Sequence, residues 1–151
     1  MADVPKMLRN GITVSLGVDG AASNNAQDMV ELMKFTALQH KVATRDPLAM
    51  TAEKVLEMAT IGGARALKLD DKIGSLEIGK LADIIAVDLS GSHQTPTTDP
   101  VSAVVNTCSG ADILMTLVNG TALYEKNKWN VGGEVARNIA RIIEIRGKLR
   151  L

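Results

Sequence analysis

One acidic residue, Asp19, stands where a carboxylate can do chemistry. It directly follows residues 12–18, Ile-Thr-Val-Ser-Leu-Gly-Val, a short apolar run rich in β-branched residues that predicts a buried strand. Residues 19–25, Asp-Gly-Ala-Ala-Ser-Asn-Asn, then form a polar loop before a helical pattern. Because βα enzymes place catalytic groups at the carboxyl ends of their strands, Asp19 could bind a divalent metal or pass on a proton from metal-bound water.

A second interpretation of the same residues involves no chemistry. Asp19-Gly20 also has the composition of a turn, and residues 23–25 have that of a helix cap. A phosphate site on backbone N–H groups is disfavoured, because the loop has no lysine and only one glycine after Asp19. Spacing alone leaves the catalytic interpretation and the turn interpretation open.

The other residue types that ligate metals are too few to complete a site around Asp19. The chain has two histidines, His40 and His93, and one cysteine, Cys108. Neither histidine has a second histidine or cysteine at ligand spacing, so we expect His40 at a helix surface or end and His93 in solvent. Cys108 has no identifiable base and is expected to be a small buried hydrophobe. We expect a structural role for Arg65, which follows a Gly-Gly pair.

The elements that must position these residues change in type along the chain. Helical periodicity predicts helices over residues 2–10, 28–42 and 51–63, the third of them capped by Thr51, with a further helical turn over 64–67. A final amphipathic helix is predicted after Gly132-Gly133, with Val135, Ile139, Ile142 and Ile143 on one face. After residue 70 the pattern becomes β-rich, with strand-like stretches at 82–89, 101–107 and 113–118. Asn119-Gly120 predicts a two-residue hairpin.

Composition excludes several classes of function. Hydrophobic residues make up 46% of the chain, and with only three aromatic residues the core must be aliphatic. Acidic and basic residues balance at 17 each, which argues against a nucleic-acid or anionic-membrane surface. No apolar stretch approaches the length of a membrane span, and the first residues do not form a secretory signal, so a cytoplasmic location is expected.

Several segments, in order, resemble the amidohydrolase superfamily. Residues 14–25 resemble its last barrel strand and loop, most closely those of the 5-methylthioadenosine/S-adenosylhomocysteine deaminases and the related chlorohydrolases. Residues 57–67 resemble the helix that follows the barrel, and residues 74–88 the return into a small β-sandwich. Residues 118–123 fit a hairpin of that sandwich.

The resemblance implies an α/β fold, the C-terminal fragment of a (β/α)₈ TIM-type barrel with an accessory β-sandwich and a terminal helix. The expected divisions are residues 1–70 for the last βα unit and following helices, 71–131 for the sandwich portion and 132–151 for the helix. The implied activity is metal-dependent deamination of a nucleoside-type substrate, methylthioadenosine or S-adenosylhomocysteine. A chlorohydrolase, another purine or pyrimidine deaminase, and a non-catalytic assembly module are the alternatives.

The resemblance also implies roles for two residues. Asp19 matches a ligand of the family's divalent metal, zinc or a similar ion, that is also a proton shuttle, and Ser23 matches a loop position near the substrate. The family's His-x-His pair has no counterpart in this chain. Because a catalytic zinc usually needs three protein ligands, we expect the chain alone to be inactive, to hold no zinc, and to self-associate through edges that lack their barrel neighbours.

Overall fold

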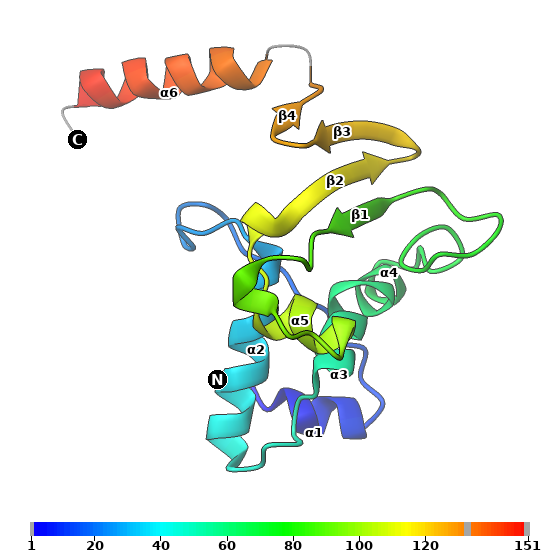
Figure 1. Ribbon diagram of the computed structural model, residues 1–151. Coiled ribbons are helices and arrows are strands. Elements are labelled where there is room, and N and C mark those ends of the chain that lie inside the picture. Colours follow the sequence, from blue (N-terminus) through cyan, green and yellow to red (C-terminus); the bar gives the residue numbers. More distant parts are fainter. Residues whose placement is uncertain (1, 132–133, 150–151) are drawn as a thin grey trace.

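The computed structural model describes residues 2–131 and 134–149, in which helices and one antiparallel sheet form separate layers (Figure 1). The helices are α1 (Val4–Arg9), α2 (Met29–Thr44), α3 (Ala52–Ala59), α4 (Ile61–Ala66), α5 (Pro100–Asn106) and α6 (Glu134–Leu149). The strands are β1 (Ile84–Val87), β2 (Ile113–Val118), β3 (Thr121–Glu125) and β4 (Lys128–Trp129). Two 3₁₀ turns, η1 (Ser92–Gln94) and η2 (Gly110–Asp112), flank α5.

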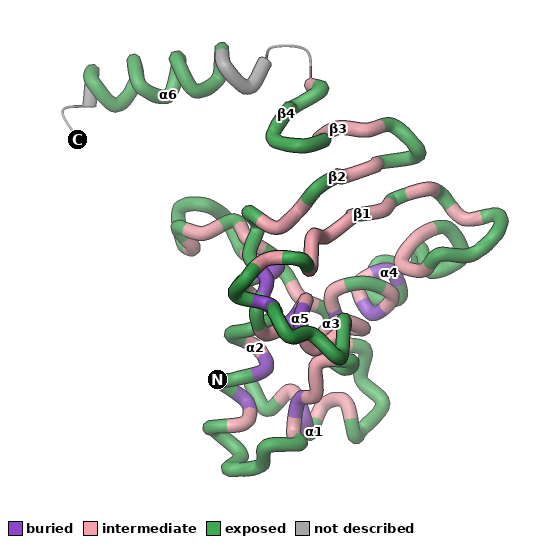
Figure 2. The backbone as a smooth tube through the Cα atoms, viewed as in Figure 1, coloured by how far each residue is buried: buried purple, intermediate pink, exposed green. Residues whose placement is uncertain are grey.

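The core lies where α2, α3 and α5 pack together. Met50, Val55 and Val105 are fully buried there. The other buried members of the cluster are also aliphatic or sulfur-containing: Val30, Met33, Ala37, Met58 and Cys108. The buried segments of the tube in Figure 2 lie mostly in the helical part that contains α2 to α5, whereas the described side chains of α6 are exposed.

The sheet has the strand order β1-β2-β3-β4, and all its neighbours are antiparallel. The predicted hairpin is confirmed: Asn119 and Gly120 join β2 to β3 with φ values of 48° and 75°. Two positive φ values in succession are the signature of the two-residue turn whose twist matches that of the strands. Residues 2–131 and 134–149 contain this one sheet and not a second one facing it, and the division at residues 70 and 131 stays a prediction.

The predicted strand over residues 101–107 is wrong, because this segment forms α5. Pro100 occupies the first turn, where a missing N–H costs nothing, and the Asp99 carboxylate accepts from the Val101 N–H at 3.0 Å. These start signals and the burial of Ala103 and Val105 in the helix outweigh the β preference of the valines.

The predicted strand over residues 12–18 is also wrong, since these residues form no strand ladder. Burial nevertheless alternates: Val14, Leu16 and Val18 are half-buried, and the residues between them are exposed. Such alternation is typical of extended backbone with one face on a core. A strand needs hydrogen-bonded neighbours, and here the Leu16 N–H meets only the Met58 carbonyl, at 3.4 Å.

The predicted helix over residues 51–63 divides into α3 and α4 at Thr60, whose φ and ψ are −120° and −102°, and the further turn predicted over 64–67 falls at the end of α4. The division turns Gly62 toward residues 12–18. A Cβ at Gly62 would stand 2.9 Å from the Glu57 carbonyl oxygen and 3.4 Å from the Val14 carbonyl oxygen. Gly62 therefore allows the segment that leads to Asp19 to pass close to α4.

Candidate catalytic loop at Asp19

Asp19 opens a compact loop between the 12–18 segment and α2. Its side chain is exposed, and its Oδ1 accepts from the Gly20 N–H at 2.6 Å. Its φ of 65° lies in the left-handed region, which non-glycine residues seldom adopt and which aspartate tolerates better than most. The result is a carboxylate that faces solvent from a tightly turned backbone.

The loop is closed by hydrogen bonds of its own. The N–H groups of Ser23 and Asn24 both donate to the Gly20 carbonyl at 2.9 Å. The Asn24 amide donates to the Val18 carbonyl at 2.8 Å, and the Gln27 amide donates to the Asp19 carbonyl at 3.2 Å. The predicted turn character of residues 19–25 is thus present, and it does not compete with a chemical role for the side chain. The helix cap predicted at residues 23–25 is wrong, because the residue that caps α2 is Asp28.

Ser23 lies on the same loop with its side chain exposed. Within the described part of the chain, no hydrogen bond joins its hydroxyl to Asp19. Its role near a substrate stays a prediction.

The residues that the structure describes do not form a complete metal site. Among residues 2–131 and 134–149, no group of three histidine, cysteine, aspartate or glutamate side chains is placed to hold an ion. A catalytic zinc uses three protein ligands and one open position. Asp19 offers one hard oxygen ligand, so the described residues by themselves do not fit a zinc ion.

The two histidines lie away from Asp19. His40 is buried, 6% exposed, which corrects the expectation of a surface position. It continues the face formed by Val30, Met33 and Ala37 at helical spacing on α2, a periodicity that could have predicted its burial. The side chain of His93 is 52% exposed, as expected, and its Nε2 lies 3.3 Å from an Asp112 oxygen.

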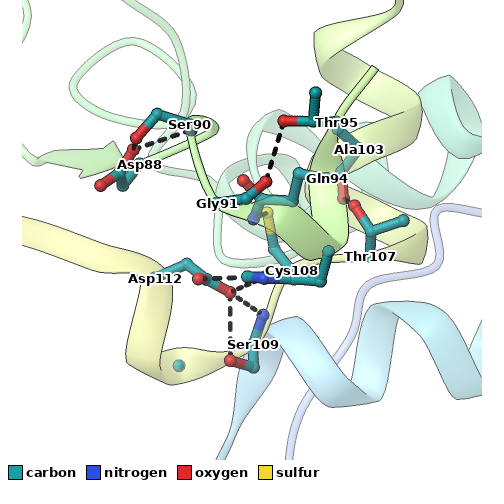
Figure 3. Close-up of polar contacts among 12 residues, drawn as sticks. Asp88, Ser90, Gly91, Gln94, Thr95, Ala103, Thr107, Cys108, Ser109 and Asp112 are labelled. Carbon is teal, nitrogen blue, oxygen red and sulfur yellow. Dashed lines mark hydrogen bonds and ion pairs between the residues drawn. The ribbon is translucent and has the colours of Figure 1, made fainter. Parts of the chain in front are cut away.

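Asp112, at the end of η2, makes several of the polar contacts drawn in Figure 3. Its Oδ2 accepts from the Ser109 N–H at 2.8 Å and from the Ser109 hydroxyl at 3.1 Å. The Ser109 N–H is the main cause of the lowered pKa of the Asp112 carboxyl, with the contact to His93 adding to it. These contacts stabilise the start of β2, and none of them involves Asp19.

Cys108 and Arg65 have the structural roles expected of them. Cys108 is buried with the Gln94 amide nitrogen 3.1 Å from its sulfur, and burial raises the pKa of the thiol (Figure 3). A raised pKa leaves little thiolate, which is the nucleophilic form. Arg65 donates to the Glu57 carboxylate at 3.0 Å and joins α4 to α3.

Asp28, which sequence reasoning missed, connects this loop to the sheet. One oxygen, Oδ1, accepts from the N–H groups of Val30 and Glu31 at 2.8 and 3.2 Å and caps α2. The other, Oδ2, accepts from the Gly110 N–H at 2.9 Å, 82 residues along the chain. The end of the loop therefore lies against η2 and the start of β2 (Figure 1). The capping position is readable from the sequence, whereas the partner at Gly110 is not.

Replacing Asp28 by asparagine is expected to lower the free energy of unfolding by about 1–3 kcal/mol, because an amide NH₂ cannot accept from the Gly110 N–H. Asparagine still caps a helix well, so the cap itself should survive. Asp99→Asn is the matched control, since Asp99 caps α5 through the Val101 N–H. Urea unfolding measures both variants, and equal shifts in the two midpoints would contradict a stabilising tie to Gly110.

Comparison with known proteins places the chain in a family. The Amidohydrolase family model matches residues 1–123, and the chain belongs to this family. A 5-methylthioadenosine/S-adenosylhomocysteine deaminase of Syntrophobacter fumaroxidans is 44% identical over 149 residues, 95% of this chain and 34% of that protein. A 5′-deoxyadenosine deaminase of Methanosarcina barkeri is 46% identical over 85% of this chain and 29% of its own length. An S-triazine hydrolase of Gordonia rubripertincta is 44% identical over 82% and 26%.

Solved structures with a similar fold support this family assignment. An adenosine deaminase from Xanthomonas campestris with bound zinc superposes with a TM-score of 0.94 at 29% identity, over 99% of this chain and 34% of that one. A zinc complex of atrazine chlorohydrolase from Arthrobacter aurescens gives 0.84 at 31% identity, over 93% and 31%. The fold is thus that of part of a barrel amidohydrolase, as predicted, and the chain spans about a third of the length of the relatives that it matches.

The helices described here include none that could cross a bilayer, because none combines sufficient length with sufficient apolar character.

Proposed function

We propose that the complete protein containing this chain hydrolytically deaminates an adenosine-type thioether, methylthioadenosine or S-adenosylhomocysteine. The observation that carries the proposal is Asp19, an exposed carboxylate at the end of an alternately buried segment, inside the part of the chain that matches the family. The name of the relative from Syntrophobacter fumaroxidans, at 44% identity over 95% of this chain, supports the substrate class.

Asp19 suits the proton transfers of this reaction. Water adds to the ring carbon that bears the amine, and ammonia leaves, so a base must take a proton from the water and an acid must return one to the departing nitrogen. An exposed carboxylate held at one backbone position can do both in turn. A divalent metal bound in the complete protein would supply a Lewis acid, and we propose Asp19 as the one ligand from this chain.

The remaining ligands would have to come from residues outside those described, since these hold no cluster of three. For this reason we propose that the 151-residue chain alone is inactive and holds no stoichiometric zinc. We further propose that it self-associates through the segment around Ile12, whose side chain is 48% exposed.

A second candidate is hydrolysis of a triazine, in which water displaces chloride or an amine from an aromatic ring. The identity with the S-triazine hydrolase, 44% over 82% of this chain, favours it specifically. A carboxylate at Asp19 would serve either reaction, because both begin with water adding to an electron-poor ring carbon.

Assay of the complete protein, loaded with zinc, separates these functions. The substrates are methylthioadenosine, adenosylhomocysteine, 5′-deoxyadenosine and a chlorinated triazine, with ammonia and chloride both quantified. We expect ammonia release to be fastest from one of the two thioethers. Faster chloride release would favour the triazine reaction, and a folded, metal-loaded protein that turned over none of the four would support a non-catalytic assembly module.

A further inference from the structure

Two side-chain amides reach across the loop to the backbone on either side of Asp19. The Asn24 Nδ2 donates to the carbonyl of Val18, the residue before Asp19, at 2.8 Å. The Gln27 Nε2 donates to the carbonyl of Asp19 itself at 3.2 Å. Both peptide planes that flank the Asp19 Cα are thereby held by residues from the far side of the loop.

The orientation of the Asn24 amide is fixed by its partners. Its nitrogen faces the Val18 carbonyl oxygen, which can only accept, and its oxygen accepts from the Ala26 N–H at 3.2 Å, which can only donate. A rotated amide would put two acceptors together and two donors together. Gln27 is connected to the same unit, because its nitrogen also donates to the Asn24 carbonyl at 3.2 Å.

These contacts act on the direction of the Asp19 carboxylate. The direction of the Cα–Cβ bond follows from φ and ψ, and the φ of 65° at Asp19 is one that an L-residue keeps only where its surroundings enforce it. The hydrogen bond that the carboxylate itself accepts from the neighbouring Gly20 N–H lies within the same turn and cannot anchor that turn to the 12–18 segment. The hydrogen bond from the Asn24 amide to the Val18 carbonyl provides that anchor.

We propose that Asn24 and Gln27 are positioning residues that hold Asp19 in the conformation its chemistry requires. This inference rests on the proposed role of Asp19. Neither amide is assigned a contact with substrate or metal; each acts through the backbone at Asp19. Supporting hydrogen bonds of this kind around a ligand or catalytic group typically account for 10- to 100-fold in metal affinity or activity.

Variants of equal size test the proposal in the complete protein. Asn24→Asp keeps an acceptor for the Ala26 N–H but has no N–H for the Val18 carbonyl. Gln27→Met is uncharged, has similar length, and donates to neither of its two carbonyl partners. We expect each to lower kcat/KM by about 10- to 100-fold, mainly through kcat, and to weaken zinc binding measured by chelator competition. The loop peptide spanning residues 19–27 should also exchange its amide hydrogens faster.

Asn25→Asp is the matched control, because it adds the same charge one residue further on, at an exposed side chain. Its kcat/KM, zinc affinity and amide exchange should remain near those of the unaltered protein. If Asn24→Asp and Gln27→Met match this control in all three measurements, the positioning role is overturned. If Asp19→Asn also has no effect, the proposed function of Asp19 fails instead, so the two failures can be told apart.

Discussion

Replacing Asp19 by asparagine in the complete protein is expected to lower kcat/KM by roughly 10²–10⁴-fold, the range by which positioned acid–base groups accelerate reactions. Asparagine has nearly the same shape and can still accept from the Gly20 N–H, so the turn should persist. What is lost is the negative charge and the ability to take up a proton. Steady-state kinetics on the best thioether substrate, together with zinc content per chain, measure the effect.

Asp46→Asn provides the control for this substitution. Asp46 is also an exposed loop carboxylate, and its Oδ1 accepts from the Leu48 N–H at 2.8 Å, much as Asp19 accepts from Gly20. It lies beyond α2 and outside the loop, so its replacement should leave kcat/KM unchanged. An Asp19→Asn protein that retained normal activity and zinc content would leave the residue with only its role in the turn.

Replacing Gly74 by alanine is expected to lower the free energy of unfolding by about 2–4 kcal/mol. A Cβ there would lie 2.7 Å from the Ala64 Cβ and 2.9 Å from the Ile61 Cα, and neither atom is the end of a flexible side chain. Relieving the overlap by shifting α4 costs about 1–3 kcal/mol. The φ of 92° adds about 1 kcal/mol, because alanine rarely adopts it. Urea and thermal unfolding midpoints measure the loss.

Gly79→Ala separates the two causes. Its φ of 96° is nearly the same, and an added Cβ would meet nothing within 4 Å. We expect this variant to lose only the conformational part, about 1 kcal/mol. Midpoints that fell equally in both variants would show that the contact between Gly74 and α4 contributes nothing.

Local signals made much of this fold predictable. The hairpin at Asn119-Gly120 needs two residues that accept positive φ, and its sequence supplies them. The predicted N-cap at Thr51 depends on a side chain and an N–H group within one turn. The Asp19 loop also contains its own hydrogen-bond donors and acceptors, so its compact form follows from residues 18–27.

Structural features that depend on competing local signals, or on contacts between distant segments, were not predictable in the same way. Residues 101–107 have both β-branched valines and a helix start at Asp99-Pro100, and burial against α2 and α3 favours the helix. Residues 12–18 have the composition of a strand, but ladder partners must come from elsewhere in space. His40 has helical spacing from Val30, Met33 and Ala37, which indicates a shared face, but that this face of α2 meets the core is set by the packing of other helices.

By itself the sequence determined the position and type of the candidate catalytic group, the turn that presents it and the family to which the chain belongs. Only the tertiary structure showed that Asp28 ties the end of the Asp19 loop to Gly110, and that two amides hold the backbone at Asp19. The physical reason is the separation along the chain of the groups that interact. Caps and tight turns form between neighbours in the chain, whereas the contact from Asp28 to Gly110 and the absence of a metal cluster among the described residues depend on which distant segments meet.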